Sequence, residues 1–391
     1  MDQLISPLGK SSAVQKLCDT HTPYEKSKNL DLLFIEAMQE IILWHESHCD
    51  FYKKLLVKNN FHIDQLKKIE DLSLIPGIWA HFFKTHEILS IKQKDVFLHL
   101  TSSGTLGQKS QVFFDAWSLQ SAQRMVDWIY QHYGWVDAKT KTNYLLYSYE
   151  SEQSTKLGTA YTDNFLCKYS PIENVFYALR RDGRGGHEFD IFGTIRALQD
   201  FEKEGKPVRI FGFPAFLYFT CLRMKDLGLK PLKLNPQSLL FSGGGWKSHN
   251  QQQVSKKEFY QVVEDWLGIP NERLRDGYGS TEHCIPYIEC KNHQFHVPIW
   301  SRVLIRDFKT LDVLPYGQNG FIHFVSPYIT SMPAHAVTMG DMATLYPGSK
   351  CGCGIETDYF VLQGRAGLSN NKSCAVAAGE LLKSMSHRGS P

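Results

Sequence analysis

Apolar residues recur at helical spacing over residues 27–58. This spacing predicts one long amphipathic helix. The helical region is expected to end before Pro76, because a residue that precedes proline avoids the helical basin. We therefore expect a helical N-terminal region over residues 1–95. The predicted apolar face of the long helix consists of Leu33, Ala37, Ile41, Trp44 and His48.

Strand-like and helix-like stretches alternate from residue 96 onward. Asp115 is placed to cap a helix that stops at Gly134. Alternating strands and helices favour an α/β fold with parallel strands. The predicted strands are 96–100, 144–149, 208–211 and 238–241, and the predicted helices between and after them are 190–205, 216–227 and 256–267.

The predicted secondary structure changes at about residue 285, from alternating helices and strands to strand-like runs separated by turns. These runs are FHVPIW, SRVLIRD and GFIHFVS. We therefore predict an α/β core over residues 96–350 that includes an added β-rich part from about 285. A short hinge and tail would occupy residues 351–391.

Composition and charge exclude several classes of protein. The chain has 391 residues, of which 42% are hydrophobic, so a large core is expected. A net charge of +3 without a basic block gives no reason to expect nucleic acid as a partner. The longest apolar run, Ile210–Leu222, is shorter than the about 20 residues that a membrane span needs. The N-terminus lacks the apolar stretch of a secretory signal, and the nine cysteines are an odd number, so we expect a cytoplasmic protein.

A loop between a predicted strand and a predicted helix, TSSGTLGQKSQ (101–111), has the composition of a phosphate cradle. Glycines let backbone N–H groups approach an anion, hydroxyls donate hydrogen bonds, and Lys109 supplies positive charge. It is not a Walker loop, because Gly104 and Gly107 are too close together. The triplet 243–245 does not complete a dinucleotide motif either, since Ser248 stands where glycine is required. Taken alone, the loop fits an ordinary polar turn equally well.

Three later motifs change the interpretation of this loop. They are YGSTE (278–282), Gly340-Asp341 and Gly364-Arg365. Each of them alone also fits a helix cap or a turn. In this order, the four motifs resemble those of the adenylate-forming superfamily of acyl- and aryl-CoA synthetases. The resemblance implies that fold, with ATP and Mg²⁺ as cofactors.

The resemblance also implies roles for individual residues. Thr281 would contact the phosphate of the adenylate, and Glu282 would help to hold Mg²⁺. Asp341 would accept hydrogen bonds from the ribose hydroxyls, and Arg365 would lie near ribose or phosphate. The implied phosphate cradle is Thr101, Ser102, Ser103, Gly104, Thr105, Gly107 and Lys109. The implied adenine pocket and its surroundings are Gly243, Gly244, Gly245, Trp246, Tyr278 and Gly279.

Two departures from the usual pattern of the superfamily point to one branch of it. Leu106 replaces a usual threonine, and the chain ends at Pro391, too early for a full C-terminal lid domain with its catalytic lysine. A chain of this length is similar to the long-chain-fatty-acid–protein ligases, the acyl-protein synthetases of bacterial luminescence fatty-acid reductases. The resemblance covers residues 70–376. The strings that carry it are Ile75-Pro76, Phe83-Lys84, the loop TSSGT, Gly212–Pro214, GGGWK (243–247) and HVPIW (296–300).

Members of that family form acyl-AMP, transfer the acyl group to a cysteine near their own C-terminus, and pass it to a reductase. Cys374 occupies the matching place, with Lys372 near enough to favour its thiolate. An idle or buried tail cysteine is the alternative. The aromatic run 211–219 is either a core segment or the wall of an acyl or aryl pocket.

The remaining cysteines include a predicted metal site. Cys290 and His296 precede a Cys351-x-Cys353 pair, and three thiolates with one imidazole suit a tetrahedral structural zinc. His293 competes with His296, and Cys284 competes with Cys290. Cysteines without a metal are the alternative.

Three functions remain open from the sequence. The first is an ATP-dependent acyl-protein synthetase that acts on a carboxylic acid, with a long-chain fatty acid expected and an acyl-accepting reductase as partner. The second is an acyl- or aryl-CoA ligase that transfers to coenzyme A or a carrier protein. The third is a nucleotide-binding subunit without catalysis.

Overall fold

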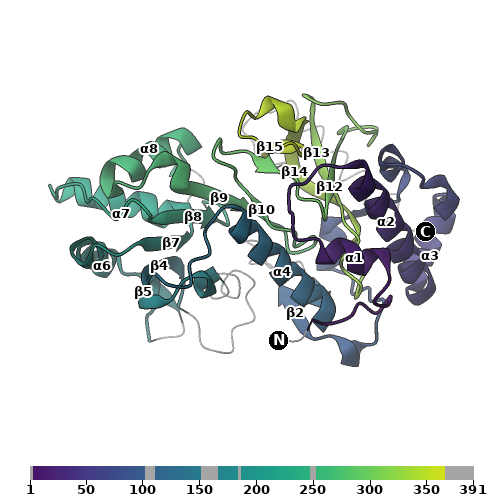
Figure 1. Cartoon of the computed structure of the whole chain (residues 1–391), viewed down its shortest axis with the longest axis horizontal. Coiled ribbons are helices and arrows are strands. Elements are labelled where there is room, and N and C mark those ends of the chain that lie inside the picture. The colour runs from purple at the N-terminus through teal and green to yellow at the C-terminus, as the bar shows by residue number, and fades with distance from the viewer. Residues whose placement is uncertain (1–2, 102–110, 151–165, 184–185, 247–251, 366–391) are drawn as a thin grey trace. The chain divides into compact units, whose positions relative to one another are not determined.

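The computed structural model describes residues 3–101, 111–150, 166–183, 186–246 and 252–365 (Figure 1). The chain divides into two compact units, and each unit is built from more than one segment. The first unit comprises the described residues of Met1–Trp128, Gly279–Tyr287 and Gln294–Pro391. The second comprises those of Ile129–Tyr278 and Ile288–His293.

The first unit begins with three helices, α1 (Ala13–Asp19), α2 (Lys28–His48) and α3 (Asp50–Lys58). The prediction of one continuous helix over 27–58 is wrong, because Cys49 is extended, with φ −137° and ψ 103°. The predicted apolar face is also rotated, since His45 is buried whereas His48 is exposed. His45 is accommodated in the core by polar contacts to Ser90 Oγ at 2.7 Å and to the Ile329 carbonyl at 3.1 Å.

A six-stranded sheet forms the core of the first unit. Its strands run in the order β11-β15-β14-β13-β12, and β1 adds to β14 in parallel. The other pairings in this sheet are antiparallel. The strands are β1 (Ile78–Trp79), β11 (Phe295–His296), β12 (Arg302–Arg306), β13 (Asn319–Val325), β14 (Ala336–Tyr346) and β15 (Tyr359–Arg365). A separate antiparallel hairpin joins β2 (Leu98–Thr101) and β3 (Gln111–Phe114), and α4 (Ala116–His132) follows it.

The second unit is a seven-stranded sheet in the order β10-β9-β8-β7-β4-β5-β6. The pairings from β9 through β5 are parallel, which confirms the predicted α/β class. The pairing of β5 with β6 is antiparallel. The strands are β4 (Thr142–Tyr149), β5 (Ile172–Arg181), β6 (His187–Phe189), β7 (Val208–Gly212), β8 (Leu239–Gly243), β9 (Leu274–Tyr278) and β10 (Tyr287–Ile288).

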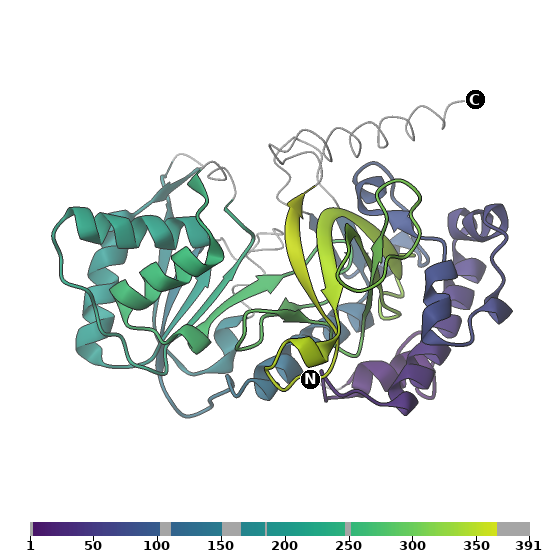
Figure 2. The ribbon, with the colours of Figure 1, turned by 90° about the horizontal axis from the view of Figure 1, so that it is seen from above.

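Helices α6 (Ile191–Glu204), α7 (Pro214–Asp226) and α8 (Lys256–Leu267) accompany this sheet (Figure 2). Leu145 and Tyr147 of β4 pack with them in one hydrophobic core. The alternate residue Tyr144 faces the opposite side, because successive strand side chains point to opposite faces. Gly205 and Gly268 end α6 and α8 in the left-handed conformation that glycine adopts easily.

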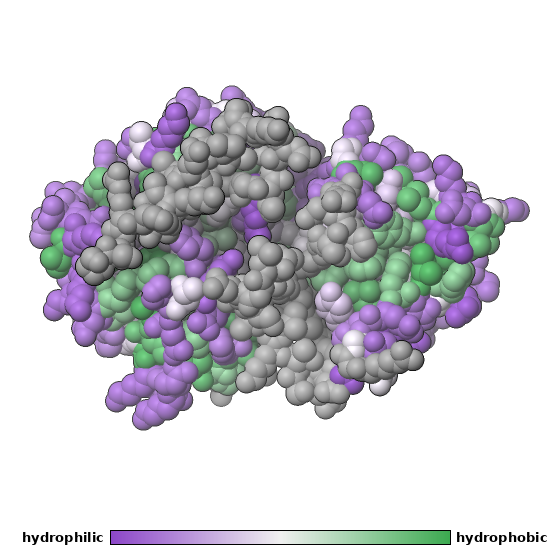
Figure 3. Space-filling model, turned by 180° about the vertical axis from the view of Figure 1, so that it is seen from behind, coloured by the Kyte–Doolittle hydropathy of each residue, from purple (hydrophilic) through white to green (hydrophobic). Residues whose placement is uncertain are grey.

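Short 3₁₀ turns complete the described secondary structure. They span Ile63–Gln65, Ile69–Leu74, Ala80–Lys84, Gln93–Asp95, Cys167–Tyr169, Asn271–Arg273 and Gly348–Lys350. None of the helices in the described ranges combines the length and the apolar character that crossing a membrane requires. On the face shown in Figure 3, hydrophilic residues are interspersed with smaller hydrophobic groups. Such mixing is ordinary for a protein surface.

Candidate active site

The predicted phosphate cradle is attached to an antiparallel hairpin. Thr101 ends β2 and pairs with Gln111 at the start of β3. The predicted helix does follow the loop, but a second short strand, β3, lies between them. The cradle residues Ser102, Ser103, Gly104, Thr105, Gly107 and Lys109, as well as Leu106, lie outside the described residues.

Asp115 anchors the segment that follows this hairpin. Its Oδ1 accepts a hydrogen bond from the Ser118 N–H at 2.7 Å, as expected of a helix cap. Its Oδ2 accepts a second bond from the Thr330 hydroxyl at 2.5 Å. The cap thus also joins the start of α4 to the loop between β13 and β14.

The YGSTE motif begins at Tyr278, the last residue of β9, and leads into a tight turn. The Ser280 carbonyl accepts hydrogen bonds from the His283 and Cys284 N–H groups at 3.2 and 2.8 Å. Thr281 is partly exposed, whereas Glu282 is buried with 6% exposure. The turn therefore holds a buried carboxylate next to a more accessible hydroxyl, which is a suitable pair for a cation and a phosphate.

His283 fastens this turn, although sequence reasoning did not single it out. Its Nε2 lies 2.9 Å from the Tyr287 hydroxyl, which lies 2.6 Å from Ser301 Oγ. The Tyr328 hydroxyl donates a bond to the His283 carbonyl at 3.0 Å. Burial lowers the pKa of His283 to about 3, so the ring is neutral at physiological pH. No local sequence signal distinguishes such a histidine from an exposed one.

Asp341 and Arg365 are brought together across β14 and β15. They are register partners in the antiparallel ladder, and Arg365 Nε donates a hydrogen bond to Asp341 Oδ1 at 3.0 Å. The Arg365 side chain is 63% exposed and that of Asp341 14%. Exposed ion pairs stabilise a protein by only about 0–1 kcal/mol. A contribution to folding stability therefore does not by itself explain why these two residues are paired. A methyl group added at the neighbouring Gly340 would meet no atom within 4 Å, so the space beside the pair is open.

The glycine triplet begins at Gly243, the last residue of β8, in the second unit. Ser242 at the end of that strand donates to Asp276 Oδ1 at 3.2 Å. Gly244 and Gly245 have φ values of 76° and 66°, which most side chains disfavour. The Trp246 ring packs in the core, with its centroid 5.5 Å from that of Tyr218. The structure therefore uses Trp246 for packing.

An ionic network around the buried Glu289, not anticipated from the sequence, holds β9 in place. Lys256 Nζ lies 3.2 Å from Asp276 Oδ2 and also contacts the fully buried Glu289. Glu289 Oε2 accepts bonds from the Tyr260 hydroxyl at 2.7 Å and the Asp276 N–H at 2.9 Å. Burial acts to lower the pKa of Lys256, but the two carboxylates outweigh it and raise that pKa. The ammonium therefore stays charged and fixes the strand that leads into YGSTE.

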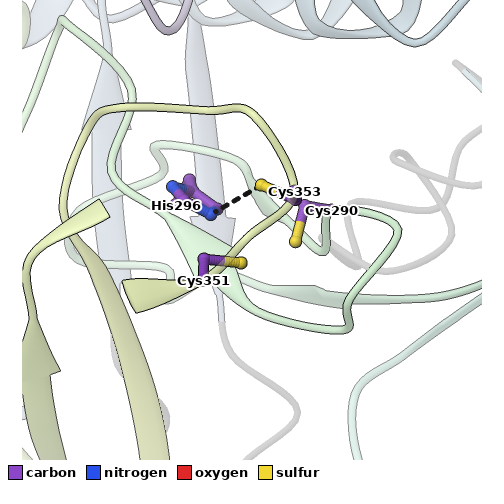
Figure 4. A group of neighbouring side chains, drawn as sticks. All are labelled: Cys290, His296, Cys351 and Cys353. Atoms are coloured by element: carbon purple, nitrogen blue, oxygen red, sulfur yellow. Dashed lines mark hydrogen bonds between the residues drawn. The ribbon is translucent and has the colours of Figure 1, made fainter. Parts of the chain in front are cut away.

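The predicted metal ligands also lie together (Figure 4). The nearest ligand atoms of Cys290, His296, Cys351 and Cys353 all lie within 4.8 Å of one another. The competing residues are engaged elsewhere. His293 Nε2 lies 2.8 Å from Asn271 Oδ1, and the Cys284 thiol donates to the Thr281 carbonyl. Cys374, the predicted acyl acceptor, lies outside the described residues.

Known structures have the same fold. The open conformation of 2-hydroxyisobutyryl-CoA ligase in complex with 2-HIB-AMP and CoA matches with a TM-score of 0.65 at 13% identity. The match covers 89% of this chain and 79% of that one. The postadenylation state of the same ligase matches with a TM-score of 0.64 at 14% identity, over 89% and 71% of the two chains. These matches confirm the predicted adenylate-forming fold.

Sequence relatives point to a particular branch of this fold. A long-chain-fatty-acid–luciferin-component ligase of Vibrio harveyi is 27% identical over 277 residues, 69% of each chain. The ligase of the same description from Aliivibrio fischeri is 23% identical over 311 residues, 78% of this chain and 77% of that one. The model of the family described as acyl-protein synthetase, LuxE, matches residues 6–383. This chain therefore belongs to the LuxE acyl-protein synthetase family.

Proposed function

We propose that this ligase activates a long-chain fatty acid with ATP and transfers the acyl group to a protein cysteine thiol. The observation that carries the proposal is the family match over residues 6–383. The arrangement of the described motif residues supports it, because Asp341 and Arg365 lie side by side and Glu282 is held in a tight turn. The two relatives, both fatty-acid ligases by description, support the choice of acid.

The first step would join the acid to the nucleotide. A carboxylate oxygen attacks the α-phosphorus of ATP, the bond to the bridging oxygen breaks, and pyrophosphate leaves. Lys109 and the hydroxyls of the 101–105 loop would neutralise the growing negative charge, which is the main protein contribution in such chemistry. Glu282 would hold Mg²⁺, which screens the phosphates when it is bound. Asp341 would accept hydrogen bonds from the ribose.

The second step would move the acyl group to sulfur. The Cys374 thiolate attacks the carbonyl carbon, the bond to the AMP oxygen breaks, and AMP leaves, so that a thioester forms without any redox change. Lys372 is near enough in sequence to favour the thiolate. An acyl-accepting reductase would then receive the group. We place the reaction in the cytoplasm, where free thiols persist, and the eight described cysteines are all free.

The test is a pair of measurements on the purified full chain. Fatty-acid-dependent exchange between ATP and pyrophosphate reports the first step, and radiolabelled acid retained on the protein reports the second. We expect Cys374→Ser to keep the exchange and lose the label. Cys49→Ser, a matched change at a buried cysteine, should keep both. Absence of exchange with every fatty acid tried would refute the activation step.

Transfer to coenzyme A is the second candidate. The observation in its favour is that the 2-hydroxyisobutyryl-CoA ligase with this fold was solved with CoA. Rapid formation of acyl-CoA without any label on the protein would identify this route. Zinc, the other predicted metal, has no part in either reaction.

A further inference from the structure

Four side chains from two turns converge outside the adenylation motifs. Cys290 and His296 flank the short turn that leads into β11, and Cys351 and Cys353 lie in the connection between β14 and β15 (Figure 4). Thiolates on one tetrahedral zinc lie about 3.7 Å apart, given Zn–S bonds of about 2.3 Å. The observed spread of up to 4.8 Å is within a small adjustment of that geometry. We propose that these four residues bind one structural Zn²⁺ ion.

The imidazole is held in the form that binds a metal. His296 is fully buried, and its Nδ1 donates a hydrogen bond to the Thr357 carbonyl at 2.7 Å. The proton is thereby fixed on Nδ1, because a carbonyl can only accept. Nε2 keeps its lone pair and faces Cys353 Sγ at 3.3 Å. A carbonyl partner on the second nitrogen is the usual support of a zinc-binding histidine.

Backbone donors are arranged around two of the sulfurs. The Asn292 N–H donates to Cys290 Sγ at 3.4 Å, and the Ile355 N–H donates to Cys353 Sγ at 3.3 Å. In both cases the donor lies two residues after the cysteine, so the two turns present their sulfurs in the same way. Such N–H groups stabilise negative charge on sulfur, and a zinc-bound thiolate carries that charge. Gly352 and Gly354, with φ values of 73° and 99°, permit the tight path around Cys353.

The location defines the role as structural. All four ligand positions are filled by protein, which leaves no open position for a substrate. His296 pairs with Tyr359 at the start of β15, and Cys351 and Cys353 precede the same strand. The ion would fasten one end of the β14–β15 hairpin, while Asp341 and Arg365 lie toward the other end. Zinc would stabilise the hairpin without touching the reacting groups.

The test begins with the metal content of the full chain, purified without a metal-affinity step. We expect about one zinc ion per chain by elemental analysis. X-ray absorption should show three sulfur neighbours at about 2.3 Å and one nitrogen at about 2.0 Å. Replacement by Co²⁺ should produce the intense thiolate-to-metal bands and the visible bands of a tetrahedral site.

The zinc content of several matched variants tests the proposal even if one of the variants misfolds. Cys351→Ser and Cys353→Ser should lose zinc, whereas Cys49→Ser should keep it. His296→Cys should also keep zinc, since four cysteines form a familiar structural site. Stoichiometry well below one zinc per chain after growth with added zinc would overturn the proposal. Retention of full zinc content by both serine variants would also overturn it.

Discussion

Asp341 offers a direct test of the nucleotide site at the scale of one residue. Asp341→Ala should raise the KM for ATP by about 10- to 100-fold, because a hydrogen bond to a charged acceptor contributes about 1.5–3 kcal/mol. Thermal stability should change little, since the partner Arg365 is 63% exposed. Initial rates of exchange at varied ATP, together with melting curves, measure both quantities.

The exposed Asp265 provides the control for this change. Asp265→Ala should leave the KM for ATP unaltered. If Asp341→Ala also left it unaltered, the predicted role of Asp341 in holding the ribose would be wrong.

Some properties of the candidate site residues could be predicted from the sequence, and others could not. The order of the four motifs along the chain was enough to predict the adenylate-forming fold. It did not reveal that Asp341 and Arg365 pair, since that contact depends on the register of β14 and β15. Trp246 was assigned to the adenine pocket and its surroundings by its neighbours in sequence, and its ring packs in the core. An aromatic side chain carries no sequence signal that separates these two environments.

At the scale of elements, the close approach of β13 to β12 depends on Gly320. A Cβ at this position would lie 2.3 Å from the Arg306 carbonyl oxygen, an atom of the paired strand. Gly320→Ala should therefore force the strands apart and lower the free energy of unfolding by about 1–3 kcal/mol. Denaturant unfolding measures the loss.

Gly340→Ala is the matched control for that loss. Gly340 lies in β14, and an added methyl group there meets nothing within 4 Å. Its effect on unfolding should be small. Equal destabilisation by the two substitutions would show that steric contact with β12 is not the cause.

Elements with strong local signals were predicted well, and those defined by distant contacts were not. Asp190 and Gly205 cap α6, in agreement with the helix predicted over 190–205. The break at Cys49 escaped detection, because apolar periodicity continues across it. Strand β5 was also missed, although it lies next to β4 in the sheet. Its pattern of burial along Ile172–Arg181 does not alternate cleanly, so the sequence lacks the strand signature.

At the scale of the whole molecule, several buried histidines make stability sensitive to acid. Burial lowers the pKa of His283 and of His335 to about 3, from 6.5 in the unfolded chain. Between these values the unfolded state binds protons that the folded state does not. Stability is therefore fully present above pH 6.5 and falls as pH decreases, with a slope of up to about 1.4 kcal/mol per pH unit for each histidine.

Unfolding measured from pH 7.5 to 5 would test this dependence. His335→Gln should reduce the slope, because one proton-binding group is removed from the unfolded state. The exposed His21→Gln should have the wild-type slope. An unchanged slope in His335→Gln would contradict the argument, whatever its absolute stability.

The parallel pairing of β1 with β14 joins Ile78 to Val337, which lie far apart in the chain. A ribosome adds about 5–20 residues each second, so the strand made first waits many seconds for its neighbour. The segment 129–278, in contrast, is synthesised without interruption and contains most of the second unit. During translation, Ile78 and Trp79 therefore stay without their partners in β14 until most of the chain has been made.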